Sequence, residues 1–245
     1  MFITLMWFLK KENQIFNFLP TTKDFLIGLI FPKICLSCGE NGFSLCPKCE
    51  NKIKILKTDI CIYCGKISTK GKICRKCRRK SSLTGVIVAA KYSGIIKESI
   101  HSFKYDGNRD LLMPLGKILT TKFLAIKIPG QIMITSVPLH RTRKNFRGFN
   151  QSELLGRYLA NETGVQYQDL LKKIKFTESQ IQFHKNERID NLKGAFETKT
   201  INLHKKKIIL VDDVCTSGAT LEACAKELRR IGAQEVWGLV LAHGN

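Results

Sequence analysis

The stretch that most constrains this chain covers residues 206–220 and reads KKIILVDDVCTSGAT. Residues 208–211 are apolar and mostly β-branched, with charge on both sides, and so predict a buried strand. Asp212 and Asp213 follow, and a short polar loop then leads into residues 221–231, whose apolar side chains have helical spacing. Where a strand passes through such a loop into a helix, unpaired backbone N–H groups and the helix dipole favour an anion. The stretch therefore predicts an α/β fold with a phosphate site.

The loop and the acidic pair supply different halves of that site. Gly218 allows close approach of the backbone, and Thr216, Ser217 and Thr220 add hydroxyl donors. The two carboxylates can accept hydrogen bonds from two adjacent sugar hydroxyls. A sugar 5′-phosphate satisfies both halves. An ordinary polar turn is the competing interpretation, and the ordered series of carboxylates, hydroxyls and glycine argues against it.

This motif resembles the phosphoribosyl-pyrophosphate (PRPP) binding motif of type I phosphoribosyltransferases. The resemblance implies that Asp212 and Asp213 contact the ribose hydroxyls. It also implies that a five-residue loop wraps the 5′-phosphate: Thr216, Ser217, Gly218, Ala219 and Thr220. Ser217 stands where the family more often has Thr, a change that keeps the hydroxyl.

Eight of the ten cysteines form four Cys-x-x-Cys pairs in the first third of the chain: Cys35, Cys38, Cys46, Cys49, Cys61, Cys64, Cys74 and Cys77. This spacing favours zinc over disulfides. Two pairs make a closed, four-thiolate structural zinc site. Pairing in sequential order needs only short loops, and an interleaved order stays open. An iron–sulfur cluster or a dithiol switch is the alternative chemistry.

The formal charge of +21, from 41 Lys and Arg against 20 Asp and Glu, points to polyanionic partners. A generally lysine-rich proteome is the plainer explanation. The densest basic run extends from Lys66 to Lys80, between and after the last cysteine pairs, and includes Arg75, Lys76, Arg78 and Arg79. With Tyr63 nearby as a stacking surface, it predicts contact with single-stranded nucleic acid, whose unpaired bases expose their faces. A solvated surface is the alternative.

The remaining elements alternate between strands and helices. Strands are predicted at 86–92, 132–137, 170–175 and 235–242, and helices at 95–105, 110–126 and 152–161. Such alternation predicts a mostly parallel sheet with both faces covered. The polar stretch 176–191 is expected to be a lid, and Lys104, Tyr105 and Arg109 are expected at the surface.

A second cationic cluster follows the strand at 132–137 and contains Arg141, Arg143, Lys144 and Arg147. We predict that it forms a loop at a strand end beside the acidic pair, since ligands of parallel sheets bind at the carboxyl ends of strands. Arginine forks bind phosphate oxygens bidentately, so the cluster predicts a pyrophosphate site. A loop facing solvent or nucleic acid is the alternative.

Taken together, the motifs resemble the ComF family: the cysteine pairs, FKYDGNRDL, VPLHRTRKNFRGFNQSELL, ESQIQFHKNERIDNLKGAF and ILVDDVCTSGAT. The resemblance implies a double zinc-ribbon module at 25–80 and a type I phosphoribosyltransferase-like domain at 81–245, after an extension of unknown role at 1–24. We expect the apolar run 24–31 to pack the module onto the rest.

The family is associated with competence, so the resemblance implies a protein that binds PRPP and Mg²⁺ and acts in DNA uptake and natural transformation, with single-stranded DNA contact. The alternatives are an active phosphoribosyltransferase of nucleotide metabolism and a scaffold that docks a helicase-like partner. In the enzyme, a nucleobase or amine attacks the ribose and pyrophosphate leaves. Mg²⁺, Arg141 and Arg143 would then stabilise the leaving group, and Arg147 would bind PRPP.

The first nine residues are apolar, but Lys10 and Lys11 follow them, the reverse of a secretory signal, and no small-residue cleavage site appears. No apolar stretch is long enough to span a bilayer. We therefore expect a cytoplasmic protein.

Overall fold

The computed structural model describes residues 33–176, 192–199 and 203–244. The predicted extension at 1–24, the apolar run 24–31 and nearly all of the predicted lid lie outside the described residues. The described part contains four short helical segments besides its main elements: α3 (Pro47–Glu50), η1 (Thr69–Gly71), α4 (Arg75–Arg78) and η2 (Arg109–Leu111). No helix in this part of the chain has the length and apolar character needed to cross a bilayer.

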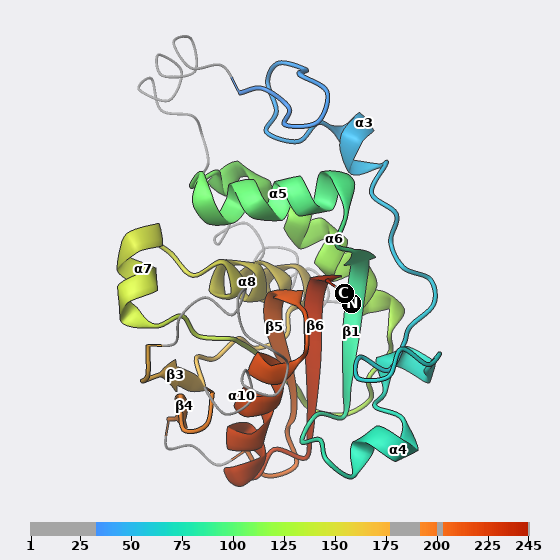
Figure 1. Cartoon of the computed structure of the whole chain (residues 1–245), viewed down its shortest axis with the longest axis vertical. Helices are drawn as coiled ribbons and strands as arrows, with labels where there is room; N and C mark the ends of the chain where they lie inside the picture. Colours follow the sequence, from blue (N-terminus) through green and yellow to red (C-terminus); the bar gives the residue numbers. More distant parts are fainter. Residues whose placement is uncertain (1–32, 177–191, 200–202, 245) are drawn as a thin grey trace, which may run out of the picture.

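A parallel sheet forms the centre of the molecule (Figure 1). Its order is β1-β6-β5-β2, and every neighbouring pair is parallel. The strands are β1 (Gly85–Lys91), β2 (Ile132–Ser136), β5 (Lys207–Cys215) and β6 (Glu235–His243). The two central strands have nearly continuous buried residues, as expected for strands covered on both faces. The predicted α/β class with a mostly parallel sheet is confirmed.

Helices cover both faces of this sheet, and alternate side chains of β1 point to each. Ile87 and Ala89 belong to a buried cluster with residues of α5 (Gly94–Tyr105), α6 (Leu112–Ala125) and α8 (Gln151–Thr163). Val86 and Val88 belong to a second cluster with residues of α10 (Ala219–Arg230). We call these the α5 face and the α10 face.

The strand predicted at 170–175 forms, but it is shorter than predicted and does not join the central sheet. Tyr167 makes a single parallel bridge to Ile134 of β2, and the chain then turns away. β3 (Leu171–Lys173) pairs instead with β4 (Phe196–Thr198) in a separate antiparallel ribbon. In this segment only Leu170 and Leu171 are buried, and two lysines follow them. That is too little apolar surface for a strand that must be covered on both faces.

The two cysteine-rich halves of the predicted zinc module pack on opposite faces. Cys35, Cys46 and Cys49 lie in the cluster of the α5 face, whereas Cys61 and Ile73 lie in the cluster of the α10 face. In Figure 1, α3 and α4 accordingly lie far apart, above and below β1.

The segment that joins these halves runs along the outer edge of β1. Ile55 forms an antiparallel bridge to Ala90, and the buried ammonium of Lys122 binds Asp59 at 2.7 Å and donates to the Leu56 carbonyl at 2.6 Å. Because these contacts cover the edge strand, they also protect it from pairing with other chains.

Candidate functional site

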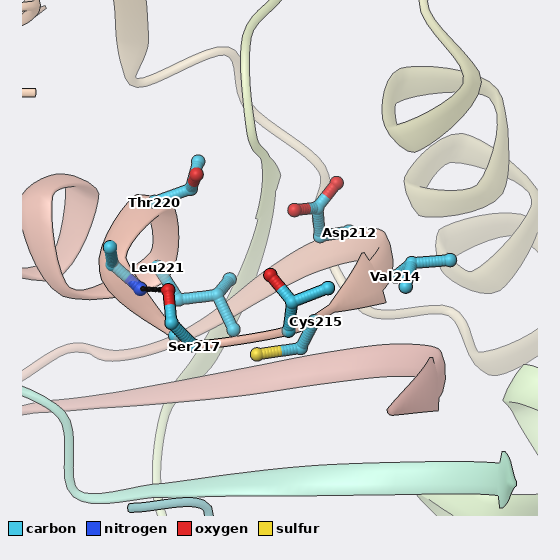
Figure 2. A pocket seen from close by; sticks show the side chains of 9 residues that line it. Asp212, Val214, Cys215, Ser217, Thr220 and Leu221 are labelled. Atoms are coloured by element: carbon cyan, nitrogen blue, oxygen red, sulfur yellow. Dashed lines mark hydrogen bonds between the residues drawn. The ribbon is translucent and has the colours of Figure 1, made fainter. Parts of the chain in front are cut away.

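The end of β5, the following loop and the start of α10 enclose a small pocket (Figure 2). Its volume is about 100 Å³ and its lining is Asp212, Val214, Cys215, Thr216, Ser217, Gly218, Ala219, Thr220 and Leu221. The five residues that the sequence predicts for the phosphate loop thus line one pocket together with the first carboxylate. We refer to residues 216–220 as the phosphate loop.

The strand that leads to this pocket is longer than predicted and contains the acidic pair within it. Val214 and Cys215 still pair with Ala242 and His243 of β6, so β5 ends four residues beyond the predicted boundary. Gly218 then adopts a left-handed φ of 78° and caps α10, where its carbonyl accepts from the backbone N–H of Glu222 at 2.8 Å. This conformation is one that glycine adopts without strain.

Asp212 is held by the first turn of α8. The hydroxyl of Ser152 donates to Asp212 Oδ1 at 2.8 Å, and the backbone N–H of Asp213 donates to the same oxygen at 3.0 Å. Burial and the neighbouring charge of Asp213 outweigh these donors and raise the pKa of Asp212 to about 7. The carboxyl therefore changes charge near neutral pH.

Asp213 is buried and paired with Lys104, a residue predicted to lie at the surface. Lys104 Nζ lies 2.7 Å from Asp213 Oδ1, with only 19% of the lysine side chain exposed. Burial disfavours the charged ammonium of Lys104. Its attraction to Asp213, and less strongly to Asp212, is larger and raises the pKa of Lys104. The predicted surface position of Lys104 is wrong, whereas Tyr105 and Arg109 are exposed as predicted.

A signal for Lys104 was present in the spacing of α5. Ile96 and Ile100 are buried, and Lys104 continues the same stripe at steps of four residues. A cation on the apolar stripe of a helix needs a buried partner. No pattern indicated which carboxylate that partner would be, because Asp213 is far away in the sequence.

The arginine cluster forms a short helix rather than the predicted loop. α7 (Arg141–Arg147) begins at His140, whose Nδ1 accepts from the backbone N–H of Thr142 at 3.3 Å, and ends at Gly148 in the left-handed region. These two caps provide hydrogen bonds for backbone groups at the ends of the helix. The segment has too few apolar residues for a helix to be predicted from their spacing.

The segment that leads into α7 leaves β2 beside the acidic pair, because β2 pairs with β5. The backbone N–H of Val137 donates to the Val211 carbonyl at 2.9 Å, so the chain leaves β2 next to the carboxyl end of β5. Arg147 stacks on Tyr105 at 4.8 Å, and Arg143 lies 5.9 Å from the Phe176 ring. None of the α7 arginines lines the described pocket.

The four sulfurs of each half of the cysteine-rich region converge. In each set all sulfurs lie within 4.8 Å of one another, and the sets are Cys35, Cys38, Cys46 and Cys49, then Cys61, Cys64, Cys74 and Cys77. Ligands about 2.3 Å from one tetrahedral zinc lie about 3.8 Å apart. The Cys38–Cys46 and Cys64–Cys74 sulfur distances are both 3.6 Å, so the residues fit the ion. The pairing is sequential, and we call the two halves the first and second zinc ribbons.

Backbone donors prepare the thiols for an ion in the same way in both ribbons. The N–H of Cys46 points at the Cys35 sulfur at 3.4 Å, and the N–H of Cys74 points at the Cys61 sulfur at 3.5 Å. Zinc binds the thiolate form, and a backbone N–H that points at a sulfur stabilises that form.

The basic residues of the second ribbon are exposed, but its tyrosine is not a stacking surface. Arg75, Lys76 and Arg78 form α4, and Arg79 follows it at the surface. Tyr63 is half-buried, and its hydroxyl donates to Glu222 Oε2 at 2.6 Å. The predicted role of Tyr63 is therefore wrong.

Comparisons with known proteins agree with both parts of the chain. Residues 26–78 match the double zinc ribbon domain and residues 150–245 match the phosphoribosyl transferase domain. Competence protein F of Haemophilus influenzae is 29% identical over 85% of this chain and 96% of its own length. Competence protein ComFC of Bacillus subtilis is 27% identical over 84% and 92%, and the DNA utilization protein YhgH of Escherichia coli K12 is 28% identical over 86% and 98%.

Among solved structures, a purine phosphoribosyltransferase of Pyrococcus horikoshii Ot3 aligns with a TM-score of 0.34 and 18% identity, over 54% of this chain and 73% of that one. That likeness is too weak to carry an argument. The chain thus matches a double zinc ribbon domain followed by a phosphoribosyl transferase domain, and it is similar to two competence proteins and a DNA utilization protein along nearly their whole length. These matches confirm the predicted resemblance to the ComF family.

Proposed function

We propose that this protein binds PRPP with Mg²⁺ at the carboxyl end of β5 and acts in DNA uptake and natural transformation. The observation that carries the proposal is that Asp212 and the phosphate loop line the same pocket. Gly218 caps α10 within this loop. The names of its relatives, two competence proteins and a DNA utilization protein, support the cellular role.

Each part of the site has a distinct task in this proposal. The backbone N–H groups and hydroxyls of the phosphate loop hold the 5′-phosphate, because a helix start with unpaired N–H groups favours an anion. Asp212 and Asp213 accept hydrogen bonds from the ribose hydroxyls. Arg141, Arg143 and Arg147, all in α7, bind the pyrophosphate.

The acidic pair has the hard oxygen donors that Mg²⁺ prefers. Lys104 already neutralises Asp213, however, so the chain alone has little negative charge left to attract a free cation. We infer that Mg²⁺ enters together with the pyrophosphate, whose charge it offsets. The chain itself binds and orients the sugar and the phosphates.

Calorimetry with PRPP and Mg²⁺ tests the ligand. Asp212→Asn with Asp213→Asn should lose at least a few kcal/mol of binding free energy, since a charge-assisted hydrogen bond contributes roughly 1.5–3 kcal/mol. Thr216→Val should weaken binding less, because the backbone N–H groups remain. Asp106→Asn, at an exposed carboxylate that follows α5, is the matched control and should bind like the wild type. Equal affinity in the double variant and the wild type refutes the assignment.

Whether the bound PRPP is consumed is a separate question. The enzyme alternative requires release of pyrophosphate in the presence of an acceptor. A panel of nucleobases and amines, assayed for PRPP-dependent pyrophosphate release, distinguishes an active phosphoribosyltransferase from a PRPP-binding protein. Release with any acceptor establishes the transferase, and binding without release favours a PRPP-binding protein that is not an enzyme.

We further propose that single-stranded DNA contacts the four exposed cations Arg75, Lys76, Arg78 and Arg79. In a plot of log affinity against log salt concentration, each phosphate contact on a single strand adds about −0.7 to the slope. Replacing all four by Ser should therefore flatten the slope by about three units.

The rival surface is α7, where Phe146 is 86% exposed among arginines and offers the aromatic face that Tyr63 does not. A variant with Arg141, Arg143, Lys144 and Arg147 replaced by Ser is the matched comparison. An unchanged slope in the α4 variant, with a flattened slope in the α7 variant, would move the DNA site to α7.

A further inference from the structure

The second zinc ribbon touches the back of the phosphate loop. A Cβ atom placed on Gly218 would lie 3.4 Å from Tyr63 Cε1 and 3.8 Å from Ile62 Cδ1, so these two side chains cover this glycine. Ile62 and Tyr63 are the two residues between the zinc ligands Cys61 and Cys64. The turn that holds the metal therefore also supports the turn that forms the phosphate pocket.

A carboxylate on α10 strengthens this contact. Glu222 accepts hydrogen bonds from the Tyr63 hydroxyl at 2.6 Å, from the Ser81 hydroxyl at 2.7 Å and from the backbone N–H of Ser82. Its own backbone N–H donates to the carbonyl of Gly218. Glu222 thus joins the first turn of α10 to the ribbon on both sides, through the Cys61–Cys64 turn and through the residues that follow Cys77.

The first zinc ribbon has no equivalent link among the described residues. Its contacts are the Ser44 hydroxyl to Asn108 Oδ1 at 3.0 Å and Lys33 to Asp110 at 2.7 Å, both on the segment between α5 and α6. Its buried cysteines pack on the α5 face. The chain therefore contains two metal sites of the same chemistry, one beside the phosphate loop and one on the other face of the sheet.

We propose that the metal occupancy of the second zinc ribbon sets the affinity of the phosphate loop for its phosphoribosyl ligand, with Tyr63 and Glu222 as positioning residues. The inference rests on the proposed PRPP site. Backbone N–H groups bind an anion well only when their loop is already in place, since ordering it on binding lowers affinity. Metal loss releases the Cys61–Cys64 turn, and Tyr63 then no longer holds Gly218 and Glu222.

The coupling must be reciprocal, because two ligands that bias the same arrangement change each other's affinity by the same factor. PRPP with Mg²⁺ should therefore slow the chelator-driven release of one of the two zinc ions, the one in the second ribbon. Equal release rates for both ions with and without PRPP, in protein that binds PRPP, would overturn the proposal.

Cys64→Ser and Cys38→Ser form a matched pair. Each replaces the second cysteine of the first Cys-x-x-Cys pair in its ribbon, and both cysteines are exposed. Each should keep about one zinc per chain. We expect Cys64→Ser to weaken PRPP binding about tenfold, within the range of ordinary allosteric coupling, and Cys38→Ser to change it less than about threefold. Equal losses in the two variants would overturn the proposal.

Hydrogen exchange of residues 215–222 gives a readout that does not depend on PRPP. Amide protection in this segment should fall in Cys64→Ser and stay at the wild-type level in Cys38→Ser. If wild-type protein fails to bind PRPP while this difference persists, the proposed ligand is wrong and the coupling stands. If PRPP binds and the protection is the same in both variants, the coupling is wrong and the ligand stands.

Variants that keep both zinc ions test the positioning residues directly. Glu222→Ala should weaken PRPP binding several-fold with about two zinc ions retained, because it frees Tyr63 and the Ser81–Ser82 segment. Glu222→Gln keeps an oxygen acceptor and should restore most of the affinity. Wild-type affinity in Glu222→Ala, or no recovery in Glu222→Gln, contradicts the role assigned to this side chain.

Discussion

The two zinc ribbons share their ligand set but differ in what surrounds it. In the first ribbon Cys35, Cys46 and Cys49 are buried against the helices of the α5 face. In the second ribbon Cys74 and Cys77 are only half-buried, and α4 presents its cations to solvent. The first ribbon is thus part of the core of the domain, and the second combines an exposed basic surface with a contact to the phosphate loop. The same ligand set is therefore built into the core in one place and, in the other, lies beside the loop that we propose as the phosphate site.

Removing the fourth ligand of each ribbon should give the largest effect. Cys49→Ser and Cys77→Ser should each lower the zinc content from about two ions per chain to about one. Loss of a structural metal is among the few single changes that cost more than about 4 kcal/mol of unfolding free energy. We expect Cys49→Ser to reach that value and Cys77→Ser to cost less, because Cys49 is fully buried.

Elemental analysis and denaturant unfolding measure both quantities. Iron in place of zinc, or protein purified without chelator that holds no metal, would contradict the metal assignment. A larger loss of stability in Cys77→Ser would reverse the comparison between the ribbons.

The next effect concerns the charges that the α5 face supplies to the site. Lys104→Met leaves the carboxylate of Asp213 buried without its partner, and breaking a buried ion pair costs about 3–5 kcal/mol. Adding Asp213→Asn should recover part of this loss, since the double variant buries no unpaired charge. Urea unfolding of the two single variants and the double variant measures the coupling. Strictly additive losses would show that the ion pair contributes nothing to the folded state.

A pH dependence follows from the pKa of Asp212, raised to about 7 by burial and by Asp213. Binding of PRPP with Mg²⁺ should strengthen as the pH rises through about 7, because the ionised carboxyl is the better acceptor for ribose hydroxyls. The unfolding free energy should fall from about pH 4 to about pH 7, because the folded state holds a proton that the unfolded chain releases.

Calorimetry over this pH range checks the first trend and urea unfolding checks the second. Ser152→Ala removes a donor that lowers the pKa of Asp212 and should move the binding midpoint to higher pH. Asp212→Asn should abolish both trends. If the trends persist in Asp212→Asn, another group carries them.

The smallest effects come from single hydrogen bonds that join each ribbon to the domain. Ser44→Ala removes the bond to Asn108, and Tyr63→Phe removes the bond to Glu222 while keeping the ring over Gly218. Each should cost about 1 kcal/mol of stability. Only Tyr63→Phe should also weaken PRPP binding. A loss of PRPP affinity in Ser44→Ala would show that the two ribbons do not differ in their link to the site.

Local patterns were sufficient to predict the parts of the site that are continuous in sequence. The strand, the acidic pair and the phosphate loop follow one another within 206–220, and each Cys-x-x-Cys turn specifies its own ligands. Where local patterns misled, the deciding contacts were distant. Residues 170–175 have the composition of a strand, but their pairing with β4 depends on chain more than twenty residues away.

The sequence by itself determined the α/β class, the resemblance to the ComF family and the eight candidate zinc ligands, because strand periodicity, short motifs and ligand spacing act over a few residues. Only the tertiary structure decided how the parts combine. Lys104 meets Asp213 because α5 packs over the end of β5, and Tyr63 meets Glu222 across 159 residues because the second ribbon packs on the α10 face. Such contacts depend on the packing of whole elements, and a buried charge or hydroxyl takes the partner that this packing places beside it.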